Sequence, residues 1–563
     1  MAIWTLRLSL LGSLALTTSA CTAFLGIDYL ADDSEGGPDA TSEYDAPVSA
    51  MADGEEEAES ERDAGSDNQE VAASPDTSLG DAQDATVSAS DSDSEIGGDV
   101  SCTPDSTPSV CSASGIPQWC DSSGQWRDSP NGPCAGSTPT CKDGKCVECS
   151  PDVAPRRCSG THAVQTCQPD GKWGSAVACP TLCKDSACLR AIAVSAGWTH
   201  TCAILSDGLA RCWGDNQSAE LGYNNFGGWS AKPMMVSGVA DATALAAGNE
   251  FTCAIVSGGG VLCWGKNDSG QLGNVTPAGA VSCSGTSCSA MPVPVQGVTN
   301  ATALGAGRRH ACALLATGTV QCWGANFSGQ LGNGTTASST TPVMVSGLTA
   351  VTAISVGDDF NCALLSNGRV LCWGQNWGSL GTGSRYGPET CPLGGGDCAT
   401  TPVLVSGLPS AIGIAVGGGH ACARVGGSAM CWGGNEFGEL GNDSGDAGIY
   451  CQCILTPSVV PGLTDISGLA AGYWHTCALQ SGAAVCWGIN MFGELGAGSA
   501  ANSSTQPLRV MSDANITVVS AGFDHTAALT ADGAVLTWGS NGDGALGVTS
   551  TTFMSRTPLP VIW

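Results

Sequence analysis

Basic residues are scarce in this chain. Its 563 residues include 20 lysines and arginines and 6 histidines, against 51 aspartates and glutamates. Proteins that bind nucleic acid present a basic patch to the phosphate backbone, and no region of this sequence supplies one. The loop G-x-x-x-x-G-K-[ST], which cradles nucleotide phosphates, is also missing. We therefore expect no nucleic acid partner and no small-molecule cofactor.

Cysteine, in contrast, is abundant, with 31 residues. Thiols stay reduced in the cytosol, so a chain this rich in cysteine is either a zinc protein or an exported disulfide protein. Zinc sites usually combine cysteine pairs separated by about two to four residues, whereas the dominant spacing here is nine or ten. We therefore expect an exported protein with disulfide bonds and no metal site.

The N-terminus has the features of an export signal. Arg7 precedes the apolar run 8–16, and small residues then lead to Cys21. Residues 1–20 are predicted to be a signal peptide, too short to remain as a membrane span. The cysteine after small residues resembles a bacterial lipobox, so Cys21 is expected to carry the only membrane anchor. Ordinary cleavage with an incidental cysteine is the alternative. Because Thr22 is not aspartate, we favour the outer membrane over the inner membrane.

Residues 21–100 are acidic and contain few large apolar side chains. Residues 1–100 hold 23 acidic residues against two basic ones. Such a segment cannot bury enough surface to offset the entropy lost on ordering. We interpret it as a disordered, self-repelling tether behind the lipidated N-terminus.

Residues 101–148 and 149–190 are two copies of a cysteine-rich repeat. Each copy has six cysteines, and in both copies the tryptophan (Trp126, Trp173) follows the third cysteine by six positions. Modules of about 45 residues usually need cross-links to fold. We expect three disulfides per copy and a structural role, with the pairing left open among about 15 possibilities.

A longer repeat fills residues 191–563. The motifs W-G-x-N and P-x-x-V each occur seven times, and 30 or 31 positions separate each proline from the next tryptophan. From each tryptophan to the next proline the distance varies between 19 and 29. A period near 50 with short apolar runs and glycine-rich turns is typical of propeller blades. We predict an all-β fold, a seven-bladed β-propeller of four-stranded blades, preceded by the tandem module and the tether.

The order of strands within one blade follows from the same motifs. With the P-x-x-V strand taken as the first of its blade, one unit has strands at 342–345, 351–356, 361–365 and 370–373. The first blade then lacks its first strand, and the last P-x-x-V motif is left over. We expect the C-terminal strand to complete the first blade and close the ring, which would remove an exposed edge. Deletion of residues 557–563 should then destabilise the propeller sharply.

Six of the seven units place one cysteine on the third strand and one before the tryptophan, whereas the seventh has Ala527 and Thr537. Residues that disappear together are most simply bonded together, and a hairpin brings them within reach. The expected pairs are Cys202–Cys212, Cys253–Cys263, Cys312–Cys322, Cys362–Cys372, Cys422–Cys431 and Cys477–Cys486. The three longest loops add Cys283–Cys288 and Cys391–Cys398, while a bond between Cys451 and Cys453 would be strained and stays open.

Five of the six histidines share one repeat position, and Phe251 and Phe360 replace them in the other two units. A catalytic base or metal ligand would not be replaced by phenylalanine and repeated around a ring. We interpret His200, His310, His420, His475 and His525 as packing or turn residues. No Ser-His-Asp or Cys-His arrangement stands apart from the repeat, so we expect no catalytic residues and no enzyme.

The repeat resembles that of the regulator of chromosome condensation family. The likeness is clearest at 305–332, which reads G-A-G-R-R-H and then C-W-G-A-N-F-S-G-Q-L-G. The resemblance implies a seven-bladed propeller. It does not decide function, because the family includes both a nucleotide exchange factor for a small GTPase and secreted protein-binding propellers. The paired cysteines and the export signal depart from eukaryotic members and suggest an exported bacterial branch.

We expect a non-catalytic recognition scaffold at the cell surface or in the periplasm that binds a protein through one propeller face. A glycan- or cell-wall-binding adhesin is the alternative, indicated by aromatic residues on exposed turns. Guanine-nucleotide exchange is implied by the family but disfavoured by export. A hydrolase with its site in the central channel is the remaining alternative.

The two residues inside each G-x-x-H turn differ from blade to blade, while the scaffold around them scarcely changes. Turns alternate between the two faces of a blade, so these turns share one face with the variable loops. Large aromatic residues and arginine are typical of binding hot spots, whereas drift in exposed turns is the alternative. We predict that the partner contacts Trp198, Arg308, Arg309, Asp358, Asp359, Tyr473, Trp474, Phe523 and Asp524.

Overall fold

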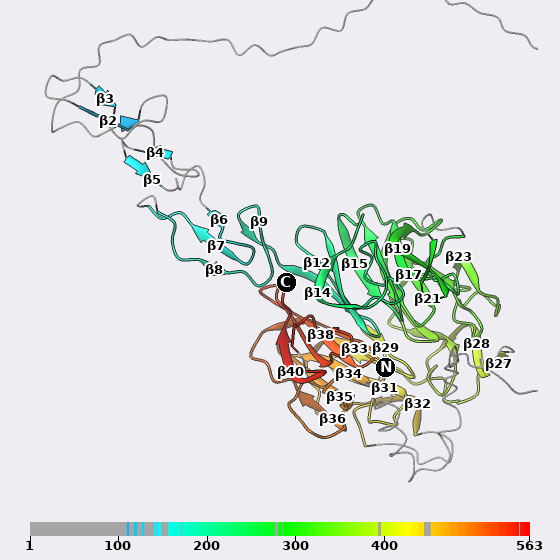
Figure 1. The fold of residues 1–563 in the computed structure, drawn as a ribbon. Helices are drawn as coiled ribbons and strands as arrows, with labels where there is room; N and C mark the ends of the chain where they lie inside the picture. Colours follow the sequence, from blue (N-terminus) through cyan, green and yellow to red (C-terminus); the bar gives the residue numbers. More distant parts are fainter. Residues whose placement is uncertain are drawn as a thin grey trace, which may run out of the picture. The chain divides into compact units, whose positions relative to one another are not determined.

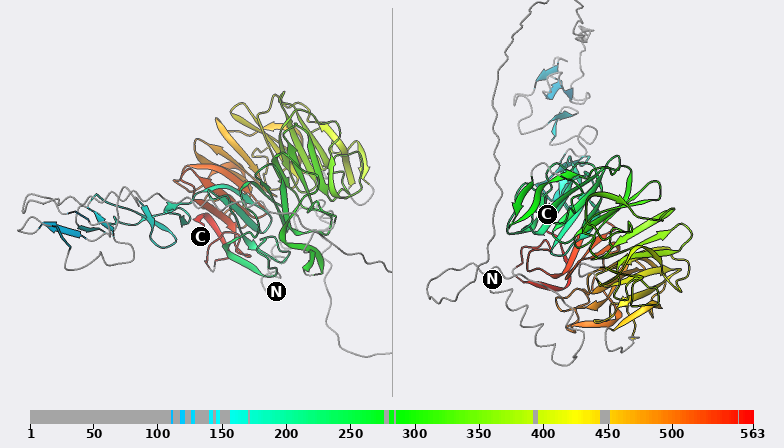
Figure 2. Two further views of the ribbon diagram at one scale, coloured as in Figure 1. Left: turned by 90° about the horizontal axis from the view of Figure 1, so that it is seen from above. Right: turned by 90° about the vertical axis from the view of Figure 1, so that its right-hand side faces the viewer.

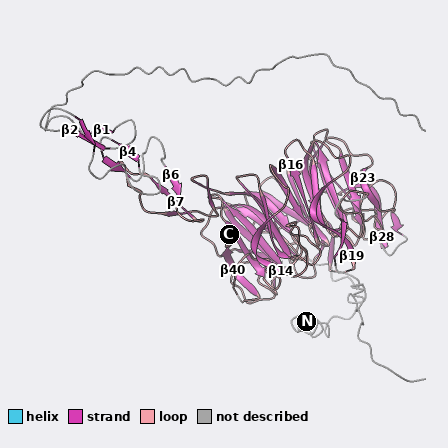
Figure 3. Ribbon diagram, turned by 45° about the horizontal axis from the view of Figure 1, so that its top comes forward, coloured by secondary structure: helices cyan, strands magenta, loops and turns pink. Residues whose placement is uncertain are grey.

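The structure, a computed structural model, describes residues 156–169, 172–275, 280–283, 285–391, 396–443, 452–550 and 552–563, together with the backbone of five short strands between residues 110 and 147. Strands, turns and loops make up these residues, and none of them is helical (Figure 3). In this part of the chain no helix could therefore cross a membrane. The predicted signal peptide, Cys21 and the acidic tether lie outside the described residues.

The two cysteine-rich copies have the same order of strands. In each copy a three-stranded antiparallel sheet precedes a two-stranded hairpin. The first copy contains β1 (Val110–Cys111), β2 (Pro117–Cys120), β3 (Trp126–Asp128), β4 (Thr140–Lys142) and β5 (Lys145–Val147). The second contains β6 (Arg156–Cys158), β7 (Ala163–Thr166), β8 (Val177–Ala178), β9 (Cys183–Lys184) and β10 (Ala187–Cys188). Two disulfides of the second copy are Cys158–Cys183 and Cys179–Cys188.

Residues 191–560 form seven antiparallel sheets that follow one another in chain order (Figures 1 and 2). The first strands are β11 (Ala191–Ala196), β15 (Ala242–Ala247), β20 (Ala301–Ala306), β24 (Val351–Val356), β29 (Gly413–Val416), β33 (Ile466–Ala471) and β37 (Ile516–Ala521). The second strands are β12 (His200–Leu205), β16 (Phe251–Val256), β21 (His310–Leu315), β25 (Phe360–Leu365), β30 (His420–Val425), β34 (His475–Gln480) and β38 (His525–Thr530).

The outer strands complete each sheet. The third strands are β13 (Ala210–Asp215), β17 (Val261–Lys266), β22 (Val320–Gly324), β26 (Val370–Gln375), β31 (Ser428–Gly434), β35 (Ala483–Ile489) and β39 (Val535–Ser540). The fourth strands are β14 (Trp229–Met235), β19 (Thr286–Pro294), β23 (Ser339–Met344), β28 (Gly396–Leu404), β32 (Cys453–Val459), β36 (Ser503–Arg509) and β40 (Met554–Pro560). In two sheets a fifth strand pairs with the fourth, β18 (Ala280–Cys283) and β27 (Glu389–Cys391).

The P-x-x-V strand is the last strand of its sheet, and the predicted order of strands is wrong. The C-terminal strand β40 pairs with β39 of its own sheet and does not complete the first sheet. The reason is that the variable loop, whatever its length, joins two strands that pair as a hairpin, so the P-x-x-V strand pairs with the W-G-x-N strand before it. The fourth strand is therefore the outer one, where a proline costs no ladder hydrogen bond and protects the edge from pairing.

The sheets meet through their first strands, each of which contacts the first strand of the next sheet, and β37 of the last sheet contacts β11 of the first. The tryptophans of W-G-x-N fix these contacts. All seven indoles are fully buried. Each donates its Nε1–H to a backbone carbonyl of the preceding sheet, as Trp264 does to Glu220 at 2.8 Å and Trp213 does to Ala545 at 2.9 Å. The last pair joins the seventh sheet to the first.

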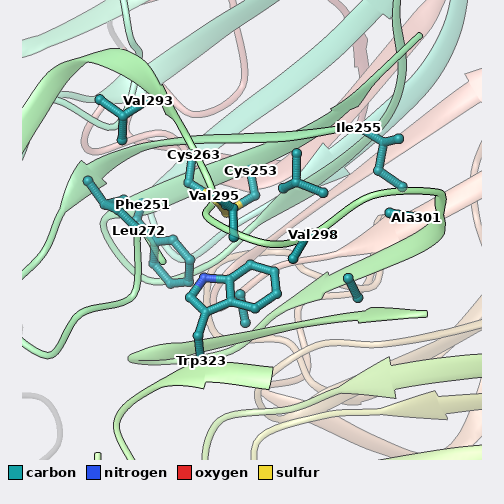
Figure 4. Close-up of a cluster of buried hydrophobic side chains, with 13 residues drawn as sticks. Phe251, Cys253, Ile255, Cys263, Leu272, Val293, Val295, Val298, Ala301 and Trp323 are labelled. Atoms are coloured by element: carbon teal, nitrogen blue, oxygen red, sulfur yellow. A yellow bond between two sulfur atoms is a disulfide. The ribbon is translucent and has the colours of Figure 1, made fainter. Parts of the chain in front are cut away.

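The core between two sheets is built on one such tryptophan. Trp323 packs on Phe251, Leu272 and Val295 of the preceding sheet (Figure 4). A buried indole removes about 200 Å² from water, so the repeated tryptophan supplies much of the apolar contact at each junction. The same arrangement recurs at the ends of the chain, where Trp213 of the first sheet packs with Val561 of the last.

The second and third strands of six sheets are cross-linked. The six pairs expected from the sequence lie directly opposite each other, with Cα–Cα distances of 4.0–4.1 Å. In the seventh sheet Ala527 faces Thr537. Cys283–Cys288 and Cys391–Cys398 pin the two added hairpins. Cys453 is disulfide-bonded, while Cys451 lies outside the described residues.

Candidate functional site: the front face and its aromatic cluster

The two ends of the sheets differ in what they carry. The turns between first and second strands and the loops between third and fourth strands lie at one end, which we call the front face. The turns between second and third strands and the connections to the next sheet lie at the other end, the rear face. This follows from the antiparallel pairing of consecutive strands in every sheet. The G-x-x-H turns and the variable loops therefore share the front face.

The glycine of each G-x-x-H turn touches the next sheet. A Cβ atom added to any of these glycines would lie under 3.0 Å from the carbonyl oxygen of the corresponding glycine in the following sheet, and that of Gly522 would meet Gly197. In six of the seven turns the following residue donates a backbone hydrogen bond across the same junction, for example Tyr473 N to Gly522 O at 3.1 Å and Phe523 N to Gly197 O at 3.2 Å. The first strands of the seven sheets line a central cavity, which we call the channel, and the first variable residue of five turns also lines it: Trp198, Asp358, Gly418, Tyr473 and Phe523.

The repeated histidines serve the same junctions. Each is buried, and its Nε2 lies 2.8–2.9 Å from a threonine hydroxyl or an asparagine oxygen of the next sheet. Burial lowers the pKa of His200 to about 3, and the charge of His525 adds to this effect. Burial also lowers the pKa of His310 to about 4. The histidines are thus neutral inter-sheet links.

Five aromatic side chains from four sheets pack together at the channel mouth. They are Trp198, Phe437, Tyr473, Trp474 and Phe523, named here the aromatic cluster. Ring centroids lie 4.5 Å apart for Trp198 and Phe523, 4.6 Å for Tyr473 and Phe523, and 4.4 Å for Tyr473 and Trp474. Trp474 lies 5.6 Å from Phe437 of the preceding sheet. Four of the cluster residues were predicted from the G-x-x-H turns. Phe437 was not predicted, although an aromatic residue three places before Leu-Gly is visible in the sequence.

Charged residues lie beside the cluster. The Arg308 guanidinium lies 5.7 Å from the Trp198 ring centroid, and the Trp198 side chain hydrogen-bonds Asp358. Burial raises the pKa of Asp358 well above its usual range; the neighbouring charge of Asp359 acts in the same direction, and Arg308 opposes both. Burial also raises the pKa of Asp359, and the charges of Arg308 and Arg309 in the preceding sheet oppose this effect.

In several turns the second variable residue faces the preceding sheet. Asp359 accepts a hydrogen bond from Gln330 of that sheet at 3.0 Å. Glu250 lies 3.4 Å from Ser218 of the preceding sheet and 2.6 Å from Lys266 of its own sheet. Asp359 and Asp524 are buried, with 7% and 6% of their surface exposed. The structure therefore does not place these two predicted contact residues where a partner would reach them.

A second set of aromatic residues lies on the front face outside the cluster, in the first, fourth and seventh sheets. In the part of the propeller that is described, the exposed aromatic side chains all lie on the front face, in or beside the loops between third and fourth strands. They are Phe226, Trp229, Trp377, Tyr386 and Phe553, with 42–65% of their surface exposed. We name them the aromatic rim. These residues were not predicted, because the loops that carry them differ in length and share no repeat position from which a common role could be inferred.

Behind the cluster, the first strands of all seven sheets line a channel cavity of about 270 Å³. Its walls are mostly alanine, glycine, serine and aliphatic residues, with Asp358 at the mouth. The described residues hold no group of three or more His, Cys, Asp or Glu side chains placed to bind a metal. The front face thus offers aromatic surface and charged residues of both signs.

Buried glutamates close three of the front loops. Glu220, Glu439 and Glu494 precede Leu-Gly and accept a hydrogen bond from the backbone two residues earlier, as from Phe492 N to Glu494 at 2.9 Å. Burial raises the pKa of Glu494 to about 8 and that of Glu439 to about 7. Gln271 and Gln330 make the same bond at 2.8 Å in two other sheets.

Glu494→Gln is expected to stabilise the propeller at alkaline pH. The folded-state pKa of Glu494 is raised above its unfolded value. The stability that the protonated carboxyl contributes is therefore fully present below pH 4.5 and is lost as the pH rises through about 8. Glutamine keeps the hydrogen bond and does not ionise. The variant should gain roughly 4 kcal/mol at pH 8 and match the wild type at pH 4, measured by chemical denaturation. Glu494→Ala loses the hydrogen bond and should be less stable than Glu494→Gln at both pH 4 and pH 8. A Glu494→Gln variant whose stability gain does not depend on pH would contradict this prediction.

Comparison with known proteins identifies the repeat. Models of the regulator of chromosome condensation (RCC1) repeat match residues 258–314, 317–364, 427–479 and 481–529, and a second form of the repeat matches 191–219, 242–271, 301–330 and 516–545. The matched residues of this chain are RCC1 repeats. The ultraviolet-B receptor UVR8 of Arabidopsis thaliana is 28% identical over 375 residues, which are 64% of this chain and 79% of the receptor.

Other relatives are similar to a shorter part of the chain or show the fold. The probable ubiquitin-protein ligase HERC4 of Rattus norvegicus is 36% identical over 167 residues, 28% of this chain and 15% of the ligase. Among solved structures, Prp20p of Saccharomyces cerevisiae has a TM-score of 0.50 at 23% identity and human WBSCR16 has 0.52 at 21%. They cover 63% and 62% of this chain and 85% and 94% of theirs, and they show the fold alone. These relatives are eukaryotic, so an exported bacterial branch is not shown.

Proposed function

We propose that this chain is a protein-binding scaffold that recognises its partner through the front face of a closed ring of seven blades. The observation that carries this proposal is the concentration of aromatic side chains at that face. The aromatic cluster brings together residues from four sheets, and the aromatic rim extends it outward. Large aromatic residues near the centre of a surface are typical of binding hot spots.

A second candidate, nucleotide exchange on a small GTPase, comes from the family alone. Yeast Prp20p binds Gsp1p and histones, and these partners are known for that protein and not for this chain. The ten disulfides between described cysteines are typical of an oxidising compartment, where cytosolic GTPases are absent. A nucleotide-release assay with purified protein distinguishes the two functions.

We further propose an exported, lipid-anchored protein, which places the propeller at the end of a long tether. The protein should take up labelled fatty acid and partition into detergent, and Cys21→Ser should abolish both. Retention of the label in Cys21→Ser would contradict lipid attachment at this residue.

Alanine on the front face should weaken partner binding. The test captures a partner with soluble protein and measures its affinity for variants at Trp198, Arg308, Arg309, Tyr473, Trp474 and Phe523. Truncating a hot spot should cost about 2 kcal/mol or more, roughly a 30-fold loss of affinity. Because Trp377 and Tyr386 are more than half exposed, alanine there gives the same test with less effect on folding.

Matched controls lie on the rear face at Asp207, Asn367 and Asp532. Each variant is checked for an unchanged unfolding midpoint before its affinity is compared. If alanine on the rear face weakens binding more than alanine on the front face, the proposed binding face is wrong.

A further inference from the structure

The charges of the propeller are divided unequally between its two faces. The rear face carries equal numbers of acidic and basic residues, which are Asp207, Asp241, Asp465, Asp513 and Asp532 against Arg190, Arg211, Arg369, Arg424 and Arg509. The remaining 14 acidic residues described between 189 and 563 lie on the front face, with six basic residues. The net negative charge of the propeller is therefore a property of the front face.

Burial reduces this imbalance without removing it. Glu220, Glu439 and Glu494 are buried, and burial raises the pKa of each. Eleven acidic residues then remain against six basic ones on the front face. Burial also raises the pKa of Asp358 and Asp359, and this rise is opposed by the charge of Arg308 at both residues and by that of Arg309 at Asp359. The other nine acidic residues still outnumber the six basic ones, so the acidic excess lies around the centre of the front face.

The unpaired acidic residues stand next to the aromatic side chains. Glu436 precedes Phe437 of the aromatic cluster and is exposed. Glu389 is exposed in the same loop as Tyr386 of the aromatic rim. A surface with this pattern attracts cations in two ways, by charge attraction to the carboxylates and by cation–π contact with the aromatic rings. It repels phosphate groups, acidic polysaccharides and anionic lipid headgroups for the same reason.

We propose that the partner of the front face is a folded protein whose contact surface is cationic, with lysine or arginine side chains around an apolar centre. This inference rests on the proposed function and adds the chemistry of the partner. The apolar centre packs on the aromatic cluster, and the basic residues pair with the carboxylates around it. Complementary charge of this kind raises the association rate and makes it dependent on salt.

The test uses a phage-displayed library of disulfide-closed loops, selected against the full chain. Enriched loops should combine lysine or arginine with an aromatic or aliphatic residue, and their affinity should fall about tenfold between low and high salt. The triple variant Asp268→Asn, Glu389→Gln and Glu436→Gln removes three exposed front charges and should weaken these loops about tenfold. The matched control, Asp241→Asn, Asp465→Asn and Asp513→Asn, removes three exposed charges from the rear face and should leave binding unchanged.

The other outcomes separate this inference from the proposed function. Neutral or acidic loops that lose binding in Trp474→Ala, but not in the front-face triple variant, would overturn the cationic partner and leave the front-face scaffold standing. Loops that bind equally well to Trp474→Ala, Trp377→Ala and the triple variant would overturn both.

Discussion

Gly522→Ala is expected to destabilise the propeller by about 3 kcal/mol or more, because overpacking at this site cannot be relieved by a flexible side chain. The added Cβ would lie under 3.0 Å from the backbone carbonyl oxygen of Gly197 and from the His525 ring. Gly522 belongs to the last sheet and Gly197 to the first, so the substitution pushes apart the junction between the two ends of the repeat. The His525 ring bonds Thr201 across this junction at 2.8 Å, which leaves it little room to move.

The control is Gly419→Ala in the fifth sheet. Gly419 lies in the same type of turn, has no atom within 4 Å of an added Cβ, and lacks a positive φ. Its replacement should change stability by less than about 0.5 kcal/mol. Both variants are measured by guanidinium denaturation of the oxidised protein. Equal midpoints for Gly522→Ala and the wild type would mean that the last and first sheets do not touch in solution.

The repeated motifs predicted the sheets well because each repeated residue acts at a junction. The tryptophan, the histidine and the first glycine of the unit all contact the neighbouring sheet, so they recur wherever two sheets meet. The order of strands could not be predicted from the same motifs. A cyclic repeat looks the same whichever strand is counted first, and only the pairing of β40 with β39 decides between the two orders.

The candidate site was predicted in part for a similar reason. The first variable residue of five G-x-x-H turns lines the channel, which gathers Trp198, Tyr473 and Phe523. In several turns the second variable residue faces the preceding sheet, as Asp359 does, which bonds Gln330 and is buried. The directions in which the two variable residues point depend on the contact between the turn glycine and the next sheet. The sequence shows this glycine but not the carbonyl oxygen that it contacts.

The second large effect is expected from removing residues 557–563. In the structure this segment is the end of the outer strand of the last sheet, and its final residues also reach the first sheet. Val561 is buried in a cluster with Trp213, and the Trp563 ring lies 5.7 Å from the Trp213 ring. The backbone of Val561 and Ile562 also bonds Val535 and Gly547.

Deletion should therefore cost about 3 kcal/mol or more, since a buried valine, part of a tryptophan and an outer strand are lost together. The strand that loses protection first distinguishes the two possible strand orders. If β40 belongs to the last sheet, hydrogen exchange should accelerate first at β39, residues 535–540. If β40 instead completed the first sheet, exchange would accelerate first at residues 191–196.

Trp563→Ala keeps the strand and removes only the contact with Trp213, so it should lower stability while β39 stays protected. A truncated protein as stable as the full chain would show that neither contact closes the ring.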